Sequence, residues 1–263
     1  MENEAPAPLL RVEGLTKKFG GVIALDRLSL SITGGEVVGL IGPNGSGKTT
    51  FFNVITGIYR ADAGRIIFKG RTLTRASPQK IHRAGISRTF QRSRLSLPLS
   101  IFDNIMIGAY NSRSKGLWFN LVRRHAFRRE FEQNLEVARA LLGVFEPKLA
   151  GRLFEPVIGL PMIDRRRIEI CRALVSEPML LLLDEPSAGM THEETRALMD
   201  NILQVRATRK GLTIVIVEHE MGVIERITDR CAVLNFGRKI AEGTYREVAC
   251  HPEVQEAYLG AAL

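Results

Sequence analysis

Residues 42–49 are Gly-Pro-Asn-Gly-Ser-Gly-Lys-Thr, and this run constrains the fold more than any other part of the chain. Its glycines let the backbone curl so that successive N–H groups point inward, toward the oxygens of a phosphate. Lys48 adds a fixed positive charge for the β- and γ-phosphates, and the hydroxyl of Thr49 can ligate Mg²⁺. The pattern is that of the phosphate-binding loop of nucleotide hydrolases.

The segments on either side of this loop support the interpretation. Residues 36–41 are mostly apolar and indicate a short buried strand that leads into the loop. Residues 49–55 can continue as a helix whose N-terminus faces the phosphates. A chance glycine-rich turn would not need this order of strand, loop and helix. The residues expected to contact the nucleotide are Gly42, Pro43, Asn44, Gly45, Ser46, Gly47, Lys48, Thr49 and Thr50.

Two further apolar runs end in polar residues. Asp184 follows four leucines and is expected to hold the Mg²⁺ shell, which prefers oxygen ligands. Glu185 comes next, where it can polarise the attacking water as a general base. His219 follows the apolar run at 212–217 and can hydrogen-bond the γ-phosphate and the water. A lone histidine is more often structural, but ligands bind at the carboxyl ends of parallel strands.

The distribution of apolar residues predicts an α/β fold with a mostly parallel core sheet. The runs at 36–41, 179–183 and 212–217 are more uniformly apolar, which suits strands of a parallel sheet covered by helices. Residues 28–32 instead alternate apolar and polar, which is typical of a half-exposed antiparallel strand. Between residues 94 and 174 the spacing turns helical, with apolar residues such as Phe127, Phe131 and Leu135 recurring every three or four positions.

Charge and cysteine content leave several classes of partner open. The net charge is +9, which suits solvated helix faces, anionic lipid heads or nucleic acid. Aromatic residues make up only 6% of the chain, so nucleic acid is the weaker option. Three widely spaced cysteines form no metal or redox pattern and favour a reducing cytoplasm. The acidic N-terminus does not resemble a signal peptide, and no apolar run approaches the ~20 residues of a membrane span.

Together these motifs resemble the ATP-binding subunit of an ABC transporter over nearly the whole chain, and within that family the branched-chain amino acid uptake group. The group's marks are residues 41–45, Arg88-Thr89-Phe90-Gln91, the long segment between Asn104 and Gly151, residues 217–220 and residues 252–260. The resemblance implies that Phe19 stacks on the adenine of ATP. It also implies that Gln91 is a ligand of Mg²⁺ and water that senses the γ-phosphate, and that residues 187–190 form the D-loop.

The resemblance also implies how the chain is organised. Its fold would be that of a P-loop NTPase of ABC type, with an N-terminal antiparallel β-subdomain and an inserted helical subdomain. A single ABC ATPase domain would cover residues 1–263. Residues 1–93 and 176–263 would form the RecA-like core with the antiparallel part, and residues 94–175 the helical subdomain.

The chain departs from the family at its signature, Leu-Ser-Gly-Gly-Gln, because residues 160–164 are Leu-Pro-Met-Ile-Asp. Pro161 has neither a hydroxyl nor an N–H, and Ile163 is branched where glycine permits close approach. Asp164 adds a negative charge near an anion, which the arginines at 165–167 offset in part if they turn inward. Proline and aspartate both suit a first helical turn, so we expect the helix to begin normally while its anion site is lost.

In this family two ATP-binding subunits pair head to tail, so that each ATP lies between one phosphate loop and the other signature. A homodimer of this chain would have two impaired sites. We therefore expect a heterodimer with a second ABC ATPase subunit that carries an intact signature.

The resemblance places such a complex at the cytoplasmic face of the inner membrane as a peripheral assembly. Transmembrane permease subunits would be direct partners and a substrate-binding protein an indirect one, and no nucleic acid is expected. Arg88, Arg92 and Arg94 would flank a groove near Gln91 that receives a permease helix.

Three alternatives remain at this point. The cargo could be urea, amides or lipopolysaccharide, because no residue of this chain contacts it. A non-transport ABC protein would usually carry two ATPase domains or added insertions, and this chain has one phosphate loop. A regulatory subunit that binds ATP without hydrolysing it is the third alternative.

Overall fold

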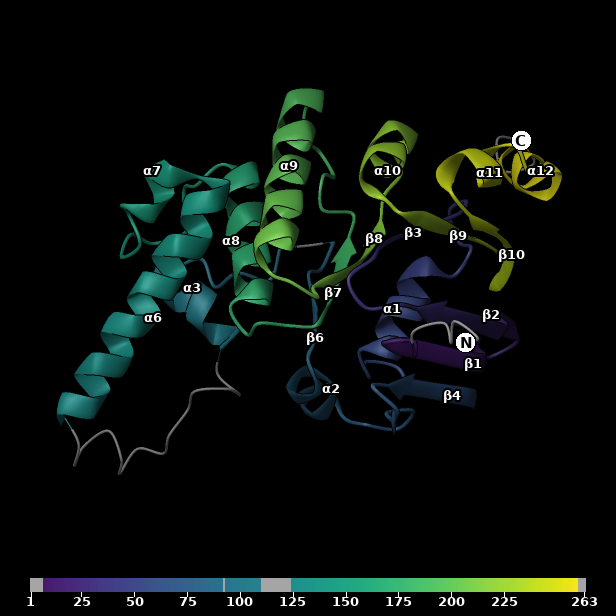
Figure 1. Cartoon of the computed structure of the whole chain (residues 1–263), viewed down its shortest axis with the longest axis horizontal. Helices are drawn as coiled ribbons and strands as arrows, with labels where there is room; N and C mark the ends of the chain where they lie inside the picture. Colours follow the sequence, from purple (N-terminus) through teal and green to yellow (C-terminus); the bar gives the residue numbers. More distant parts are fainter. Residues whose placement is uncertain (1–6, 92, 110–123, 260–263) are drawn as a thin grey trace, which may run out of the picture. The chain divides into compact units, whose positions relative to one another are not determined.

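The computed structural model describes residues 7–91, 93–109 and 124–259. Contacts divide the chain, which Figure 1 shows whole, into two compact units. The first unit comprises Met1–Arg88, Met179–Glu185 and Arg209–Leu263, and the second comprises Thr89–Pro178 and Pro186–Thr208.

A six-stranded, mostly parallel sheet forms the centre of the first unit. Its strand order is β10-β9-β3-β8-β7-β6, and only the pair β9–β10 is antiparallel. The three predicted apolar strands are confirmed, since every residue of β3, β7 and β8 is buried. The strands are β3 (Val37–Ile41), β6 (Ile86–Arg88), β7 (Leu180–Asp184), β8 (Thr213–Val217), β9 (Arg230–Asn235) and β10 (Arg238–Gly243).

A second, antiparallel sheet of the first unit has the order β2-β1-β4-β5. The predicted alternation is confirmed, because Leu28, Leu30 and Ile32 are buried while the serines between them are exposed. Helix α1 (Lys48–Ile55) lies between the two sheets, and its Phe51 and Phe52 join side chains of both sheets in one apolar core (Figure 1). The strands are β1 (Leu10–Phe19), β2 (Val22–Ile32), β4 (Ala63–Phe68) and β5 (Arg71–Thr72).

Of the four further helices in the described part of the first unit, α2 and α11 begin at a residue whose side chain caps the helix. Helix α2 begins after Ser77, whose hydroxyl accepts the Lys80 amide, and ends at Gly85 with a φ of 105°. The C-terminal segment breaks before Pro252, because Thr244 starts one helix with a capping box and a second helix begins at the proline. These helices are α2 (Pro78–Ala84), α10 (Met221–Ile227), α11 (Tyr245–Ala249) and α12 (Pro252–Leu259).

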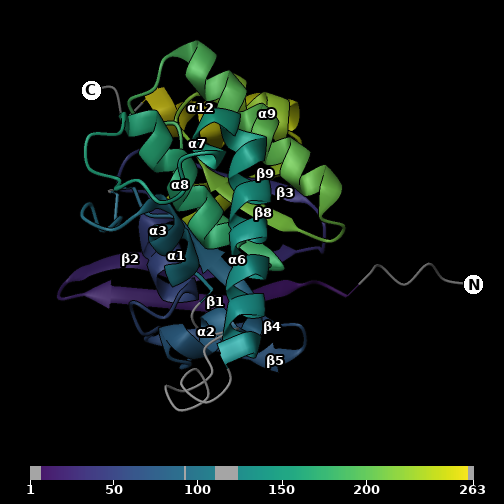
Figure 2. The same cartoon turned by 90° about the vertical axis from the view of Figure 1, so that its left-hand side faces the viewer.

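The regular elements of the second unit are all helices within the described ranges. The predicted recurrence of apolar residues every three or four positions is confirmed toward the end of α6, where Ala138 and Leu142 are buried. Phe131 is about one-third exposed, and the side chain of Phe127 lies outside the described residues. Figure 2 shows α6 with α3 and α8 beside it. The helices are α3 (Ile101–Ile107), α6 (Arg124–Phe145), α7 (Pro147–Ala150), α8 (Met162–Leu174) and α9 (His192–Thr208).

Within residues 7–91, 93–109 and 124–259, no helix is long and apolar enough to cross a bilayer.

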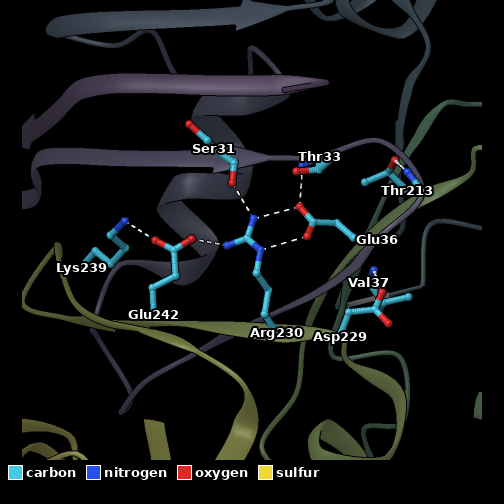
Figure 3. A network of polar contacts seen from close by, with 10 residues as sticks. Ser31, Thr33, Glu36, Val37, Thr213, Asp229, Arg230, Lys239 and Glu242 are labelled. Atoms are coloured by element: carbon cyan, nitrogen blue, oxygen red, sulfur yellow. Dashed lines mark hydrogen bonds and ion pairs between the residues drawn. The ribbon is translucent and has the colours of Figure 1, made fainter. Parts of the chain in front are cut away.

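A polar network centred on Arg230 ties the two sheets of the first unit together (Figure 3). The guanidinium of Arg230, on β9, binds both carboxylate oxygens of Glu36 at 2.8 and 2.9 Å. It also donates to the Ser31 carbonyl at the end of β2 and pairs with Glu242 of β10. Glu36 in turn accepts the Thr33 amide. Because Glu36 directly precedes β3, this network anchors the strand that leads into the phosphate loop.

We expect Arg230→Met to lower the free energy of unfolding of the first unit by about 2–3 kcal/mol. The substitution leaves Glu36 largely buried without its cation, and the side chains of Arg230 and Glu36 are only 20% and 16% exposed. Urea unfolding followed by circular dichroism measures the loss. Arg246→Met is the matched control, because Arg246 is 88% exposed in its pair with Glu225 and should change stability by less than about 0.5 kcal/mol. Equal midpoints for the two variants would contradict a stabilising network.

Candidate nucleotide-binding and hydrolysis site

The phosphate loop has the backbone that only glycine permits. Gly42 and Gly47 have φ values of 145° and 108°, in the region that other residues rarely adopt. A Cβ atom on Gly47 would lie 2.6 Å from the Ala24 carbonyl oxygen, and one on Gly42 would collide with the Leu234 carbonyl. The loop is therefore pressed against neighbouring backbone on its inner side, which leaves its other side for a ligand.

Ser46 adds an observation that points to that ligand. Its hydroxyl is buried, and among the described residues it has no hydrogen-bond partner. Burying a hydroxyl without a hydrogen bond destabilises a protein by about 1–3 kcal/mol. A hydrogen-bond partner on a bound ligand would remove this penalty. A phosphate oxygen held by the loop satisfies that requirement, and the residues present fit the nucleotide expected from the sequence.

Lys48 lies at the start of α1 and is only 6% exposed. Its ammonium donates to the carbonyls of Gly42 at 2.7 Å and Pro43 at 2.9 Å. Because an ammonium has three donors, one N–H remains available to a phosphate. Burial lowers the pKa of Lys48, and the carboxylates of Glu185 and Asp184 oppose this effect. The lysine is thus held over the loop, close to the predicted acid pair.

Three neighbouring strands bring the predicted polar residues of the first unit together. In the sheet order, β3 lies beside β8 and β8 lies beside β7. The loop starts directly after β3, and Asp184 pairs in register with Val217, the last residue of β8. His219 follows Val217 by two residues, so all these side chains come from the carboxyl ends of adjacent parallel strands.

Glu185 and His219 are in direct contact. The Nε2 atom of His219 lies 2.8 Å from Oε1 of Glu185. The side chain of His219 is 47% exposed and that of Glu185 is 15% exposed. Glu185 also has a left-handed backbone with a φ of 47°, and its amide donates to the Val217 carbonyl. Such strain in a non-glycine residue costs about 1–3 kcal/mol and is frequent at functional sites. A carboxylate fixed in this way suits a general base for water.

The magnesium set predicted from the sequence is spread over both units. Asp184 is 1% exposed at the tip of β7, whereas Thr49 is exposed and Thr50 half-buried in α1. A single hydroxyl and a single carboxylate suit Mg²⁺, which keeps several waters and binds substrate phosphates. Gln91, the third predicted ligand, is exposed and belongs to the second unit.

Phe19 ends β1 and is 42% exposed. Its ring packs edge-on against Tyr59 with 5.1 Å between centroids, and the Lys17 ammonium lies 5.1 Å from the ring. An exposed, braced aromatic face can stack on a base, so the arrangement is compatible with the adenine contact that we predicted.

The side chain of Arg88 does not lie where the sequence predicts. The prediction places Arg88 at the flank of a groove near Gln91, but its side chain is only 4% exposed and pairs with Asp184 at 2.6 Å. The prediction was wrong because Arg88 ends β6, an edge strand paired with β7, and its side chain binds Asp184 of β7 and Asn53 of α1. Arg94 is exposed, with its guanidinium 3.8 Å from the Phe90 ring centre, and Arg92 lies outside the described residues.

In the second unit, α8 holds the segment that contains Gln91. Buried Arg166 donates to the carbonyls of Phe90 at 2.7 Å and Gln91 at 3.0 Å. Glu169, also buried, pairs with Arg166 and accepts the Arg94 amide. These contacts link the helix that follows the altered signature to the backbone around Gln91, a connection that sequence reasoning missed.

The altered signature folds as expected. Pro161 caps α8, which begins at Met162, and no side chain caps the first amides. Asp164, in the first turn, binds Arg167 at 2.9 Å, and Arg167 also pairs with Glu146. Arg166 and Arg167 therefore turn inward, and one of them offsets the charge of Asp164.

A cavity of about 470 Å³ lies beside the phosphate loop within the first unit. Its walls come from the loop, the β9–β10 turn and α12. Tyr258 of α12 lies near the Gly42 backbone, and burial raises the pKa of its hydroxyl. The C-terminal helix thus lies beside the loop and lines the same cavity. The lining residues are Pro43, Asn44, Gly45, Ser46, Asn235, Phe236, Ile240, Glu253, Glu256 and Ala257.

This chain is similar to known proteins over nearly its whole length. The family model described as "ABC transporter" matches residues 25–188, and the one described as "Branched-chain amino acid ATP-binding cassette transporter" matches residues 238–263. The high-affinity branched-chain amino acid transport ATP-binding protein LivG of Salmonella typhimurium is 38% identical over 97% of this chain and 99% of its own length. BraF of Pseudomonas aeruginosa, with the same description, is 35% identical over 97% and 99%.

Solved structures show the same fold. A nucleotide-free ATP-binding cassette from an ABC transporter has a TM-score of 0.81 and 32% identity, covering 95% of this chain and 98% of its own. An ATP-binding cassette of an ABC transporter in its ADP conformation has a TM-score of 0.80 and 32% identity, covering 96% and 99%. The predicted fold class is confirmed. By this similarity along nearly its whole length, the chain belongs to the ABC transporter family, beside the branched-chain amino acid transport ATP-binding proteins, as a nucleotide-binding ATPase coupled to transport.

Proposed function

We propose that this chain is the ATP-hydrolysing subunit of an ABC importer for branched-chain or related amino acids. The observation that carries the proposal is the near-full-length similarity to LivG and BraF, whose names assign that transport to them. The match of residues 238–263 to the branched-chain amino acid cassette model supports the same cargo. Urea, amides or lipopolysaccharide as cargo have no comparable support.

In this proposal the first unit binds and positions ATP. Phe19 stacks on adenine, while Lys48 and the amides of the loop hold the phosphates. Asp184 and Thr49 would hold Mg²⁺, with Gln91 as a further ligand. When bound, the metal neutralises charge on the β- and γ-phosphate oxygens. The division into a core of residues 1–93 and 176–263 and a helical subdomain of residues 94–175 belongs to the same proposal.

Hydrolysis then depends on Glu185 and His219. Glu185 takes a proton from the attacking water, and its backbone bond to Val217 fixes the main chain that carries the carboxylate. His219 is 2.8 Å from that carboxylate and nearly half exposed, so it can orient Glu185 and also reach a γ-phosphate oxygen. The water lies between a base and a charged phosphate, which is the arrangement that in-line attack needs.

The chain would act at the cytoplasmic face of the inner membrane, with transmembrane permease subunits as direct partners. A substrate-binding protein would deliver the amino acid to those subunits. The altered residues 160–164 motivate a heterodimer with a second ABC ATPase of intact signature. This partner would complete the site around Lys48 and Glu185.

Affinity purification of the full chain from detergent-solubilised membranes tests this proposal. Mass spectrometry should identify integral membrane subunits and a second ABC ATPase with an intact signature. In proteoliposomes the purified complex should hydrolyse ATP several-fold faster with a leucine-loaded binding protein than with a ligand-free one. Recovery with ribosomal proteins or nucleic acid would contradict transport, and stimulation by urea or amides alone would correct the cargo.

A further inference from the structure

The buried guanidinium of Arg88 contacts the carboxylate of Asp184, which is the predicted ligand of Mg²⁺. Its Nη2 atom lies 2.6 Å from Oδ2 of Asp184, and the two side chains are 4% and 2% exposed. Arg88 pairs in register with Leu182 of the neighbouring strand, two residues before Asp184. Since residues two apart on a strand share a face, the arginine has a short path along the sheet to the carboxylate.

The same guanidinium reaches the helix that follows the phosphate loop. Its Nη1 atom donates to Oδ1 of Asn53 at 2.7 Å and to the Thr56 hydroxyl at 3.4 Å. The charged group also lies 5.3 Å from the centre of the Phe52 ring. One side chain thus joins α1, which starts at Lys48, to the tip of β7.

The geometry favours a role in orientation. The terminal torsion of an aspartate is broad and roughly two-fold, so an unrestrained carboxylate samples many orientations. A planar guanidinium with acceptors on two of its nitrogens fixes the direction of each bond, which a flexible lysine does not. Arg88 therefore restrains Oδ2 of Asp184 and keeps the carboxylate in one plane relative to the phosphate loop.

We propose that Arg88 is a positioning residue for the metal shell, which holds Asp184 in the orientation needed for Mg²⁺ bound with nucleotide. The inference rests on the proposed Mg²⁺–ATP site. Partners of metal ligands typically change metal affinity 10- to 100-fold when they are replaced. Arg88 should therefore strengthen the Mg²⁺-dependent part of nucleotide binding and leave the Mg²⁺-independent part unchanged.

The test is equilibrium binding of a fluorescent ADP analogue to the full chain, in EDTA and along a Mg²⁺ titration. For Arg88→Met we expect the Mg²⁺ concentration at half-saturation to rise about 10- to 100-fold, with binding in EDTA equal to wild type. Arg88→Lys keeps the positive charge but not the planar guanidinium. Its Mg²⁺ concentration at half-saturation should therefore fall between those of wild type and Arg88→Met. Asn53→Leu keeps the ion pair with Asp184 and should raise the Mg²⁺ requirement several-fold.

Controls separate the possible outcomes. Arg75→Met removes an exposed arginine of the same unit and should match wild type in every condition. Should Arg88→Met fail to fold, the lysine and Asn53 variants decide the question, with EDTA binding as their folding control. Unchanged or tighter Mg²⁺ binding in the Arg88 variants would overturn the inference, and tighter binding would mean that Arg88 competes with the metal. A wild-type chain whose nucleotide binding ignores Mg²⁺ would instead overturn the proposed site.

Discussion

A complex that contains the Glu185→Gln subunit is expected to bind ATP normally and to hydrolyse it at least about 100-fold more slowly than wild type. Glutamine keeps the size of the side chain and can still hydrogen-bond His219, but it cannot accept a proton from water. Glu185 is 15% exposed and 2.8 Å from His219, so the change should disturb the base and little else. Steady-state phosphate release and equilibrium ATP binding measure the two effects.

Glu225→Gln is the matched control for this substitution. Glu225 lies on the surface of the same unit, in a loose pair with Arg246 at 3.5 Å, and its loss should leave turnover unchanged. If the Glu185→Gln complex hydrolyses ATP at the wild-type rate, this chain supplies no catalytic base. The chain would then be a regulatory subunit that binds ATP without hydrolysing it.

Restoring the signature should raise the ATPase rate of the purified chain roughly tenfold or more, because a single oxyanion donor contributes about 10²–10³ in comparable sites. The restored variant carries Pro161→Ser, Met162→Gly, Ile163→Gly and Asp164→Gln. Pro161 occupies the cap of α8 without a hydroxyl or an N–H, so the helix N-terminus lacks the donor that a serine provides. The wild-type chain alone is therefore expected to hydrolyse ATP poorly.

The structure refines which of these four changes should matter. Arg167 already binds Asp164 at 2.9 Å, so Asp164→Gln alone should have a small effect. Pro161→Ser with Ile163→Gly should recover most of the increase in ATPase rate. The serine restores a hydroxyl, and the glycine lets a phosphate approach the backbone closely. Helicity by circular dichroism checks that the added glycines, at about 1 kcal/mol each, do not melt the helix. Full transporter turnover by the unmodified chain alone would contradict the predicted asymmetry.

Much of the first unit could be predicted because its patterns are local. The mostly apolar runs formed the buried parallel strands β3, β7 and β8, and the alternating residues 28–32 formed part of a half-exposed antiparallel strand. The glycines of the phosphate loop specify a backbone rather than a set of long-range contacts. The C-terminal break at Pro252 follows from the missing N–H of proline.

The contacts of the arginines could not be predicted in the same way. The three arginines at 165–167 look alike in sequence, yet Arg166 binds the carbonyls of Phe90 and Gln91 while Arg167 binds acids. Phe90 and Gln91 lie 76 and 75 residues from Arg166 in the sequence, and Glu146 lies 21 residues from Arg167. No local period or spacing encodes such pairs, because they depend on which elements pack together.

The phosphate loop at residues 42–49 was by itself enough to predict that this chain binds a nucleotide. Its glycines allow the backbone N–H groups to point at phosphate oxygens, and Lys48 adds a positive charge. The sequence also marked Asp184, Glu185 and His219 as residues at strand ends. Only the tertiary structure decided that β3, β8 and β7 are adjacent, so that these ends meet, and that Arg88 is buried against Asp184. The physical reason is that strand order and the pairing of buried charges are set by packing between distant segments, which a local pattern does not contain.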